Sequence, residues 1–138
     1  MVSKLAVILD TSFLFALGIE TDANHKRAKE LNLELATGRC GMAFYTDFII
    51  AELLTALRMR RVKEDSIERE GDRLIKDKEH VLAKTETLSE NAYEIFKKYS
   101  RLSFFDAMIV AFAKEYNLTK IYSFDAGFDG VKGIERVF

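Results

Sequence analysis

Proline is absent from this 138-residue sequence, glycine occurs seven times and cysteine occurs once. Without proline-rich or glycine-rich stretches, no segment resembles a flexible linker or a low-complexity tract. A single thiol cannot form an intrachain disulfide, and it cannot build a zinc site by itself. Cys40 therefore favours a reducing, cytoplasmic location.

Long apolar runs are also absent. Asp10 interrupts the run at residues 5–9, and the run at residues 13–19 is far shorter than the ~20 residues that span a bilayer. We therefore expect neither a signal peptide nor a membrane segment. The net charge of −1 gives no sign of the broadly basic surface that is usual in nucleic-acid-binding domains. Binding of a polyanion would need a local patch of cations or a metal ion.

The chain has the composition and length of one globular domain, with 49% hydrophobic and 31% charged residues. Strands are predicted at residues 5–9, 41–45, 80–83, 121–124 and 135–138. Helices are predicted at residues 22–37, from 47 to about 61, from 65 or 66 onward with Ile67, Leu74 and Ile75 apolar, at 90–99 and at 104–116. Thr11 or Ser12, Thr46 or Asp47, and Ser103 are the expected caps. This alternation predicts an α/β domain over residues 1–138, with a parallel sheet covered by helices on both faces.

Two aspartates directly follow predicted strands. Asp10 comes after LAVIL and Asp125 comes after IYSF. In open parallel sheets, ligands bind at the carboxyl ends of the strands, so both side chains are expected at that edge. The alternative is that each aspartate only caps the helix or turn that follows.

Two more carboxylates lie on apolar helix faces. Glu52 shares its side of the helix with Phe48 and Ala56, and an unpaired buried carboxylate costs several kcal/mol. The simplest partner would be Arg58 or Arg60. Asp106 is the one charged residue between Ser103 and Ala113, where a first-turn acid also suits the helix dipole by ~0.3–1 kcal/mol. That role and a functional role are compatible.

A shared cation would remove the repulsion among these four acids. The candidate ligands are all oxygens, because His25, His80 and Cys40 lie outside these motifs. Hard cations such as Mg²⁺ or Mn²⁺ prefer oxygen ligands, whereas zinc prefers nitrogen and sulfur. Mg²⁺ held by carboxylates accepts phosphate as a further ligand, which points to phosphate-ester chemistry.

With these residues assembled, the chain resembles a PIN domain over nearly its whole length. The resemblance lies in VILDTSFLFAL, TDANHKRAKEL, TDFIIAELLTAL, LSFFDAMIVAFAKEYN and IYSFDAGFDGVKGIERV, in that order. It implies a three-layer α/β/α fold around a central, mostly parallel five-stranded sheet. It also implies metal and catalytic residues at Asp10, Glu52, Asp106 and Asp125. Ser123 matches the hydroxyl position two residues before the last acid, Thr11 or Ser12 matches the position after the first, and Asp129 matches no ligand.

The family resemblance implies metal-dependent cleavage of RNA or flapped nucleic acid. Among compact PIN proteins, the chain is most similar to VapC-type toxins, which are usually dimeric ribonucleases silenced by a small antitoxin. An RNA substrate, a homodimer and an antitoxin partner are therefore expected, but none of them follows from the residues alone.

The residues that would hold RNA are a separate question. Four cations continue the helix that carries Glu52 and are candidates for phosphate contacts: Arg58, Arg60, Arg61 and Lys63. The simpler interpretation is a solvated helix end. Phe13, Phe15 and Phe128 are candidates for base stacking, although core packing is the favoured role, and His25 is expected to be structural.

Three alternative functions can be compared with these residues, and the second of them is discounted. A receiver-like phospho-acceptor signalling domain would have paired acids near the first strand and a lysine after a late strand, where this chain has Ser12 and Asp125. A haloacid-dehalogenase-type phosphatase needs an aspartate where Ser12 stands. A PIN fold that binds RNA without cleaving it is the third, and the presence of all four acids argues against it.

Overall fold

The computed structural model describes residues 6–76, 80–83 and 89–138. Its centre is a five-stranded parallel sheet in the order β3-β2-β1-β4-β5. The strands are β1 (Ala6–Leu9), β2 (Met42–Thr46), β3 (Val81–Ala83), β4 (Lys120–Tyr122) and β5 (Glu135–Val137). The predicted fold class is thereby confirmed. A receiver-like fold has the order 2-1-3-4-5, so this sheet is connected differently.

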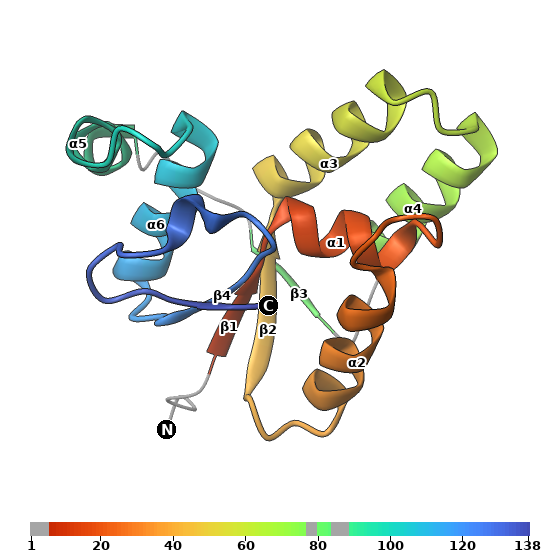
Figure 1. Cartoon of the computed structure of the whole chain (residues 1–138), viewed down its shortest axis with the longest axis horizontal. Helices are drawn as coiled ribbons and strands as arrows, with labels where there is room; N and C mark the ends of the chain where they lie inside the picture. The colour runs from red at the N-terminus through yellow and green to blue at the C-terminus, as the bar shows by residue number, and fades with distance from the viewer. Residues whose placement is uncertain (1–5, 77–79, 84–88) are drawn as a thin grey trace.

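Helices cover both faces of the sheet. They are α1 (Thr11–Gly18), α2 (His25–Ala36), α3 (Asp47–Met59), α4 (Glu64–Lys76), α5 (Ser89–Lys98) and α6 (Phe104–Glu115), with a 3-10 turn, η1 (Ala126–Phe128). Helices α1 to α4 lie on one side, and α5 and α6 lie on the other (Figure 1). Within these layers α1 packs on α2 and α3, α3 packs on α4, and α5 packs on α6. None of the helices in the described part of the chain is long and apolar enough to cross a membrane.

Strand β1 is the centre of the fold. Val7, Ile8 and Leu9 are almost fully buried, as expected for a strand enclosed by neighbours and helices. The chain moves outward from β1 to β2 and β3, and then returns to the other side of β1 with β4. This reversal creates a crevice at the carboxyl ends of β1 and β4, the usual position for ligands in open α/β sheets.

The caps of α3 and α6 agree with the sequence. The Thr46 hydroxyl accepts a hydrogen bond from the Ile49 amide at 3.2 Å. Ser103 and Asp106 form a capping box, in which the Ser103 hydroxyl accepts from the Asp106 amide at 3.1 Å and the Asp106 carboxylate accepts from the Ser103 amide at 3.3 Å. These caps fix the starts of the two helices that carry Glu52 and Asp106.

Two local predictions are wrong, and one helix was missed. Thr11 and Ser12 do not cap α1 but form its first turn, and the N-cap position belongs to Asp10. Helix α1 itself was not predicted, because its apolar sequence TSFLFALG has no polar face to reveal a helical period. Ile75 is 59% exposed, because the buried stripe of α4 is narrow and passes through its neighbour Leu74.

Candidate active site

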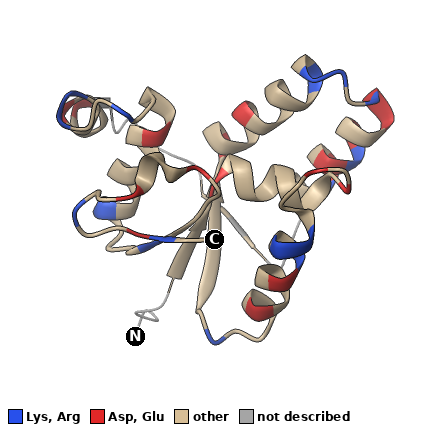
Figure 2. Ribbon diagram, in the orientation of Figure 1, with Lys and Arg blue, Asp and Glu red and all other residues tan. Residues whose placement is uncertain are grey.

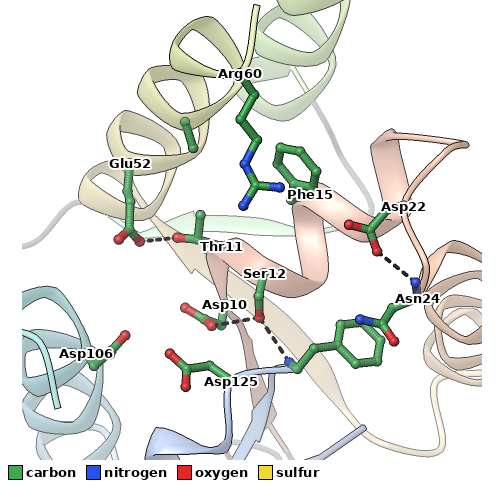
Figure 3. Close-up of a pocket in the computed structure, with 12 residues that line it drawn as sticks. Asp10, Thr11, Ser12, Phe15, Asp22, Asn24, Glu52, Arg60, Asp106 and Asp125 are labelled. Atoms are coloured by element: carbon green, nitrogen blue, oxygen red, sulfur yellow. Dashed lines mark hydrogen bonds between the residues drawn. The ribbon is translucent and has the colours of Figure 1, made fainter. Parts of the chain in front are cut away.

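A pocket of about 240 Å³ opens at the carboxyl edge of the sheet. All four acids predicted from the sequence line it: Asp10, Glu52, Asp106 and Asp125. They come from the end of β1, from α3, from α6 and from the turn after β4. Acidic segments of these elements lie around the end of the sheet (Figure 2), and Figure 3 shows the four carboxylates around one space. Positions up to 115 residues apart in sequence thus meet at one place.

Asp10 forms the floor of this pocket and is only 3% exposed. Its amide donates to the Tyr122 carbonyl at 3.0 Å, which extends the pairing of β1 with β4. One carboxylate oxygen, Oδ2, accepts hydrogen bonds from the Ser123 hydroxyl at 2.7 Å and the Ser12 hydroxyl at 3.1 Å. The other oxygen, Oδ1, is buried and has no hydrogen-bond partner.

The protonation of Asp10 reflects this environment. The pKa of its carboxyl group is raised from 3.8 to about 7, chiefly by burial; the hydrogen bond from Ser123 lowers this pKa, and the nearby Asp106 carboxylate raises it. Burial removes water that would stabilise the charged form. The ionised form therefore lacks stabilisation that a cation at Oδ1 would supply.

Ser123 joins Asp10 to Asp125. The side chain is fully buried, donates to Asp10 and accepts a hydrogen bond from the Asp125 amide at 3.0 Å. Ser12 also fastens this turn, because its hydroxyl accepts from the Phe124 amide at 2.9 Å. Asp125 itself is exposed at the rim, and its carboxylate accepts from the Gly127 amide at 2.8 Å. The predicted turn-capping role of Asp125 therefore coexists with its place in the pocket.

Glu52 has a hydroxyl partner and not the expected arginine. Its Oε2 accepts a hydrogen bond from the Thr11 hydroxyl of α1. Arg58 pairs with Glu64 at 2.8 Å, and Arg60 lies over the ring of Phe15. In the described part of the chain, no lysine or arginine forms an ion pair with Glu52. Neither Arg58 nor Arg60, the two partners considered from the sequence, therefore pairs with this carboxylate.

Asp106 combines the two roles that the sequence allowed. It caps α6 and also lines the pocket. Burial raises the pKa of its carboxyl group above the usual value, the Ser103 hydroxyl lowers it, and Asp125 and Glu52 raise it. These electrostatic couplings connect Asp106 to acids on two other elements, so the pocket holds mutually repelling carboxylates.

The donor set of the pocket suits a hard cation. Five carboxylates line it, since Asp22 joins the four predicted acids, and Arg60 is the one cationic residue among the described lining residues. The unpartnered Oδ1 of Asp10 is an oxygen that a metal ion would satisfy. Within residues 6–76, 80–83 and 89–138, no three acidic, histidine or cysteine side chains are already close enough to enclose an ion. Binding would therefore have to draw some carboxylates inward.

The structure separates the other candidates from the sequence. Arg60 alone of the four cations lines the pocket, whereas Arg61 and Lys63 are exposed away from it. Asp129 is exposed and pairs with Arg136 at 2.7 Å, in agreement with its exclusion from the ligands. Phe13 and Phe128 are fully buried, and the half-buried Phe15 lines the pocket. The Nδ1 atom of His25 lies 2.8 Å from the Ala16 carbonyl, a contact consistent with a structural role.

Sequence reasoning missed Asp22 and the hydrogen bond between Thr11 and Glu52. Asp22 precedes α2, and its carboxylate accepts from the Asn24 amide at 2.8 Å. An acid just before a helix is usually a cap, so its sequence context did not mark it as a pocket residue. The contact between Thr11 and Glu52 joins two helices that are distant in sequence, so no local pattern signals it.

Comparisons with known proteins agree with this architecture. Residues 7–134 match the PIN domain family. A VapC ribonuclease from Mycobacterium bovis is 32% identical over 90 residues, which cover 63% of this chain and 69% of that protein. The crystal structure of Mycobacterium tuberculosis VapC20, described as a sarcin-ricin loop cleaving toxin, superposes with a TM-score of 0.76 and 24% identity over 93% of this chain and 98% of that one. VapBC2 from Rickettsia felis, bound to a DNA fragment from its promoter, gives a TM-score of 0.71 and 12% identity over 96% and 98%.

Proposed function

Because the chain belongs to the PIN domain family, we propose that it is a metal-dependent endoribonuclease whose active site is the acidic pocket at the carboxyl edge of the sheet. The observation that carries this proposal is the convergence of Asp10, Glu52, Asp106 and Asp125, from four separate elements, on one pocket. The name of the Mycobacterium bovis relative supports RNA as the substrate. Mg²⁺ or Mn²⁺ is the proposed metal, because all of the donors are oxygens.

Asp10 and Asp106 are the proposed direct metal ligands. Both are buried, both have a raised pKa, and Asp10 presents an unpartnered oxygen. A divalent ion held there would supply Lewis-acid chemistry, neutralising charge on the phosphate and making water more acidic. Ser123 and Ser12 keep the Asp10 carboxylate in one orientation.

The proposed reaction is hydrolysis of a phosphodiester bond. The oxygen of water bonds to phosphorus in line with the 3′ oxygen, the bond from phosphorus to that oxygen breaks, and the leaving oxygen takes up a proton. The products are a 5′-phosphate and a 3′-hydroxyl. The proposed roles of Glu52, which accepts from Thr11, and of Asp125, which accepts from Gly127, are to orient the water and receive its proton.

Cleavage in vitro tests this proposal. The purified protein should cut a single-stranded RNA with Mg²⁺ or Mn²⁺, lose that activity in EDTA, and leave 5′-phosphate ends that a 5′-phosphate-dependent exonuclease degrades. Cleavage that persists unchanged in EDTA, or that leaves 2′,3′-cyclic phosphate ends, would contradict the mechanism. RNA binding without any cleavage would instead support the non-catalytic alternative.

We further propose that the chain is the toxin of a toxin–antitoxin pair. The supporting observation is its similarity to a VapC ribonuclease and to the VapC20 toxin fold. Expression of the chain alone is then expected to arrest bacterial growth, and co-expression of its cognate antitoxin should restore growth. Normal growth on expression of active enzyme would favour RNA processing over toxicity.

A homodimer is proposed as well. Helices α5 and α6 expose the aromatic side chains Tyr93, Phe96, Phe104 and Phe105, which are 39–53% accessible. Phe96 and Phe104 contact one another across the two helices, with ring centroids 5.8 Å apart. Such a surface is suited to a second copy. Light scattering should give the parent a molar mass twice that of one chain, and Phe104→Glu the mass of one chain. A monomeric parent would contradict the proposal.

A further inference from the structure

Arg60 occupies a distinctive place in the acidic pocket. It is the C-cap residue of α3, four residues after Ala56 and eight after Glu52, and all three residues line the pocket. Side chains on a helix lean toward its N-terminus, so a long side chain near the C-terminal end reaches back over the preceding turns. In Figure 3 the Arg60 guanidinium points into the pocket and lies beside the ring of Phe15.

An aromatic ring holds this guanidinium in position. The central carbon of the Arg60 guanidinium lies 4.6 Å from the centroid of the Phe15 ring. A cation at this distance over an aromatic face is attracted by the ring quadrupole. Phe15 belongs to α1 and itself lines the pocket. The contact therefore limits the positions available to a side chain that otherwise has many rotamers.

The Arg60 side chain is exposed to solvent, so its guanidinium donors are accessible to a ligand. Among residues 6–76, 80–83 and 89–138, its guanidinium forms neither a hydrogen bond nor an ion pair, although five carboxylates line the same pocket. The neighbouring Arg58 is different, because both Nε and Nη2 donate to Glu64, at 3.0 and 2.8 Å. The planar fork of a guanidinium suits two oxygens of one phosphate, and the ring of Phe15 positions this guanidinium without occupying its donors.

We propose that Arg60, positioned by Phe15, binds a backbone phosphate of the RNA next to the one that is cut. The inference rests on the proposed ribonuclease function and assigns one substrate contact within it. We assign Arg60 a neighbouring phosphate because it follows α3 and its partner Phe15 belongs to α1, whereas the proposed metal ligand Asp106 belongs to α6 on the other side of the sheet. The acids around Asp10 and Asp106 would hold the scissile phosphate through the metal ion.

The test measures RNA binding and its salt dependence. In an Asp10→Asn background, a fluorescein-labelled single-stranded RNA is titrated with protein at several NaCl concentrations. Arg60→Gln should weaken binding about tenfold. It should also reduce the slope of log K against log salt by about 0.7, the value for one phosphate contact on a single strand. Arg60→Lys should retain the slope, and Phe15→Leu should weaken binding while the slope is kept.

Arg61→Gln is the matched control, because Arg61 is the next residue, is exposed and does not line the pocket. This control should bind like the background protein. When Arg60→Gln is made in the active parent, it should raise KM and leave kcat nearly unchanged. This is the result expected when a mutation removes a contact that is equally strong in the ground state and the transition state.

The outcomes separate this inference from the proposed function. A parent that cleaves RNA while Arg60→Gln behaves like Arg61→Gln would overturn the phosphate contact and leave the nuclease intact. A fall in kcat with unchanged KM and salt slope would also overturn it, since Arg60 would then act only on the acids of the pocket. A parent that neither binds nor cleaves RNA would overturn the function itself.

Discussion

Asp10→Asn and Asp106→Asn are each expected to reduce RNA cleavage by more than about 100-fold, because even the loss of groups that only orient a metal ligand costs about 10–100-fold. Both substitutions nearly preserve the shape of the side chain, and both remove a charge that the proposed metal requires. Initial cleavage rates on one single-stranded RNA, at saturating Mg²⁺ and equal protein concentration, measure the effect.

The matched control is Asp129→Asn. Asp129 lies four residues after Asp125, but it pairs with Arg136 and does not line the pocket. Its variant should cleave within a few-fold of the parent. Circular dichroism should show that all three variants remain folded. Parent-like cleavage by either Asp10→Asn or Asp106→Asn would refute their assignment as ligands.

The second large effect is on stability. The folded-state pKa of Asp10 is raised to about 7, above the ordinary value of 3.8. Between these two values the folded protein binds the proton that the unfolded chain has released, so stability falls as pH rises through this window. The loss is absent below pH 3.8 and complete above about pH 7. A shift of about three pKa units corresponds to at most about 4 kcal/mol.

Denaturant unfolding in EDTA, from pH 4 to pH 8, measures this dependence. Asp10→Asn should unfold at a higher denaturant concentration than the parent at pH 8, and the difference should shrink toward pH 4. The gain should be smaller than the full 4 kcal/mol of the linkage calculation, because the amide group of asparagine would face the site of the unpartnered Oδ1. A parent that is as stable as the variant at every pH would contradict the raised pKa.

Metal addition should reverse this penalty. At 100 times its dissociation constant, Mg²⁺ should stabilise the parent at pH 8 by about 2.7 kcal/mol, because it binds the folded state only. The effect should be weaker at pH 5, where protons compete for the carboxylates, and nearly absent in Asp10→Asn. Equal stabilisation of parent and variant would place the ion elsewhere.

The sequence was sufficient for the main architecture because the relevant signals are local. A fully apolar strand followed by an aspartate located both β1 and the edge where Asp10 lies. A lone acid in the apolar sequence FFDAMIVAFA marked Asp106, and the serine before it marked the cap. Glu52 was identified because it interrupts an apolar helix face. Each of these signals needs only a few neighbouring residues.

The remaining features depend on contacts between distant segments. The hydroxyl of Thr11 reaches Glu52 because α1 packs on α3, and that packing brings Phe15 against Arg60 as well. Four cations close together in sequence looked equivalent, but only Arg60 lines the pocket, since Arg58 pairs with Glu64. The resemblance to a known family identified the four acids as one set, whereas only the structure revealed which side chains form hydrogen bonds with them.

The central claim is that carboxylates from four elements share a cation, and crystals soaked in Mn²⁺ test it most directly. Anomalous difference density, recorded above the manganese absorption edge, is expected as a peak in the pocket in contact with the carboxylates of Asp10 and Asp106. Crystals of Asp10→Asn treated identically should lose that peak. Density confined to surface acids in parent crystals, with none in the pocket, would contradict the account.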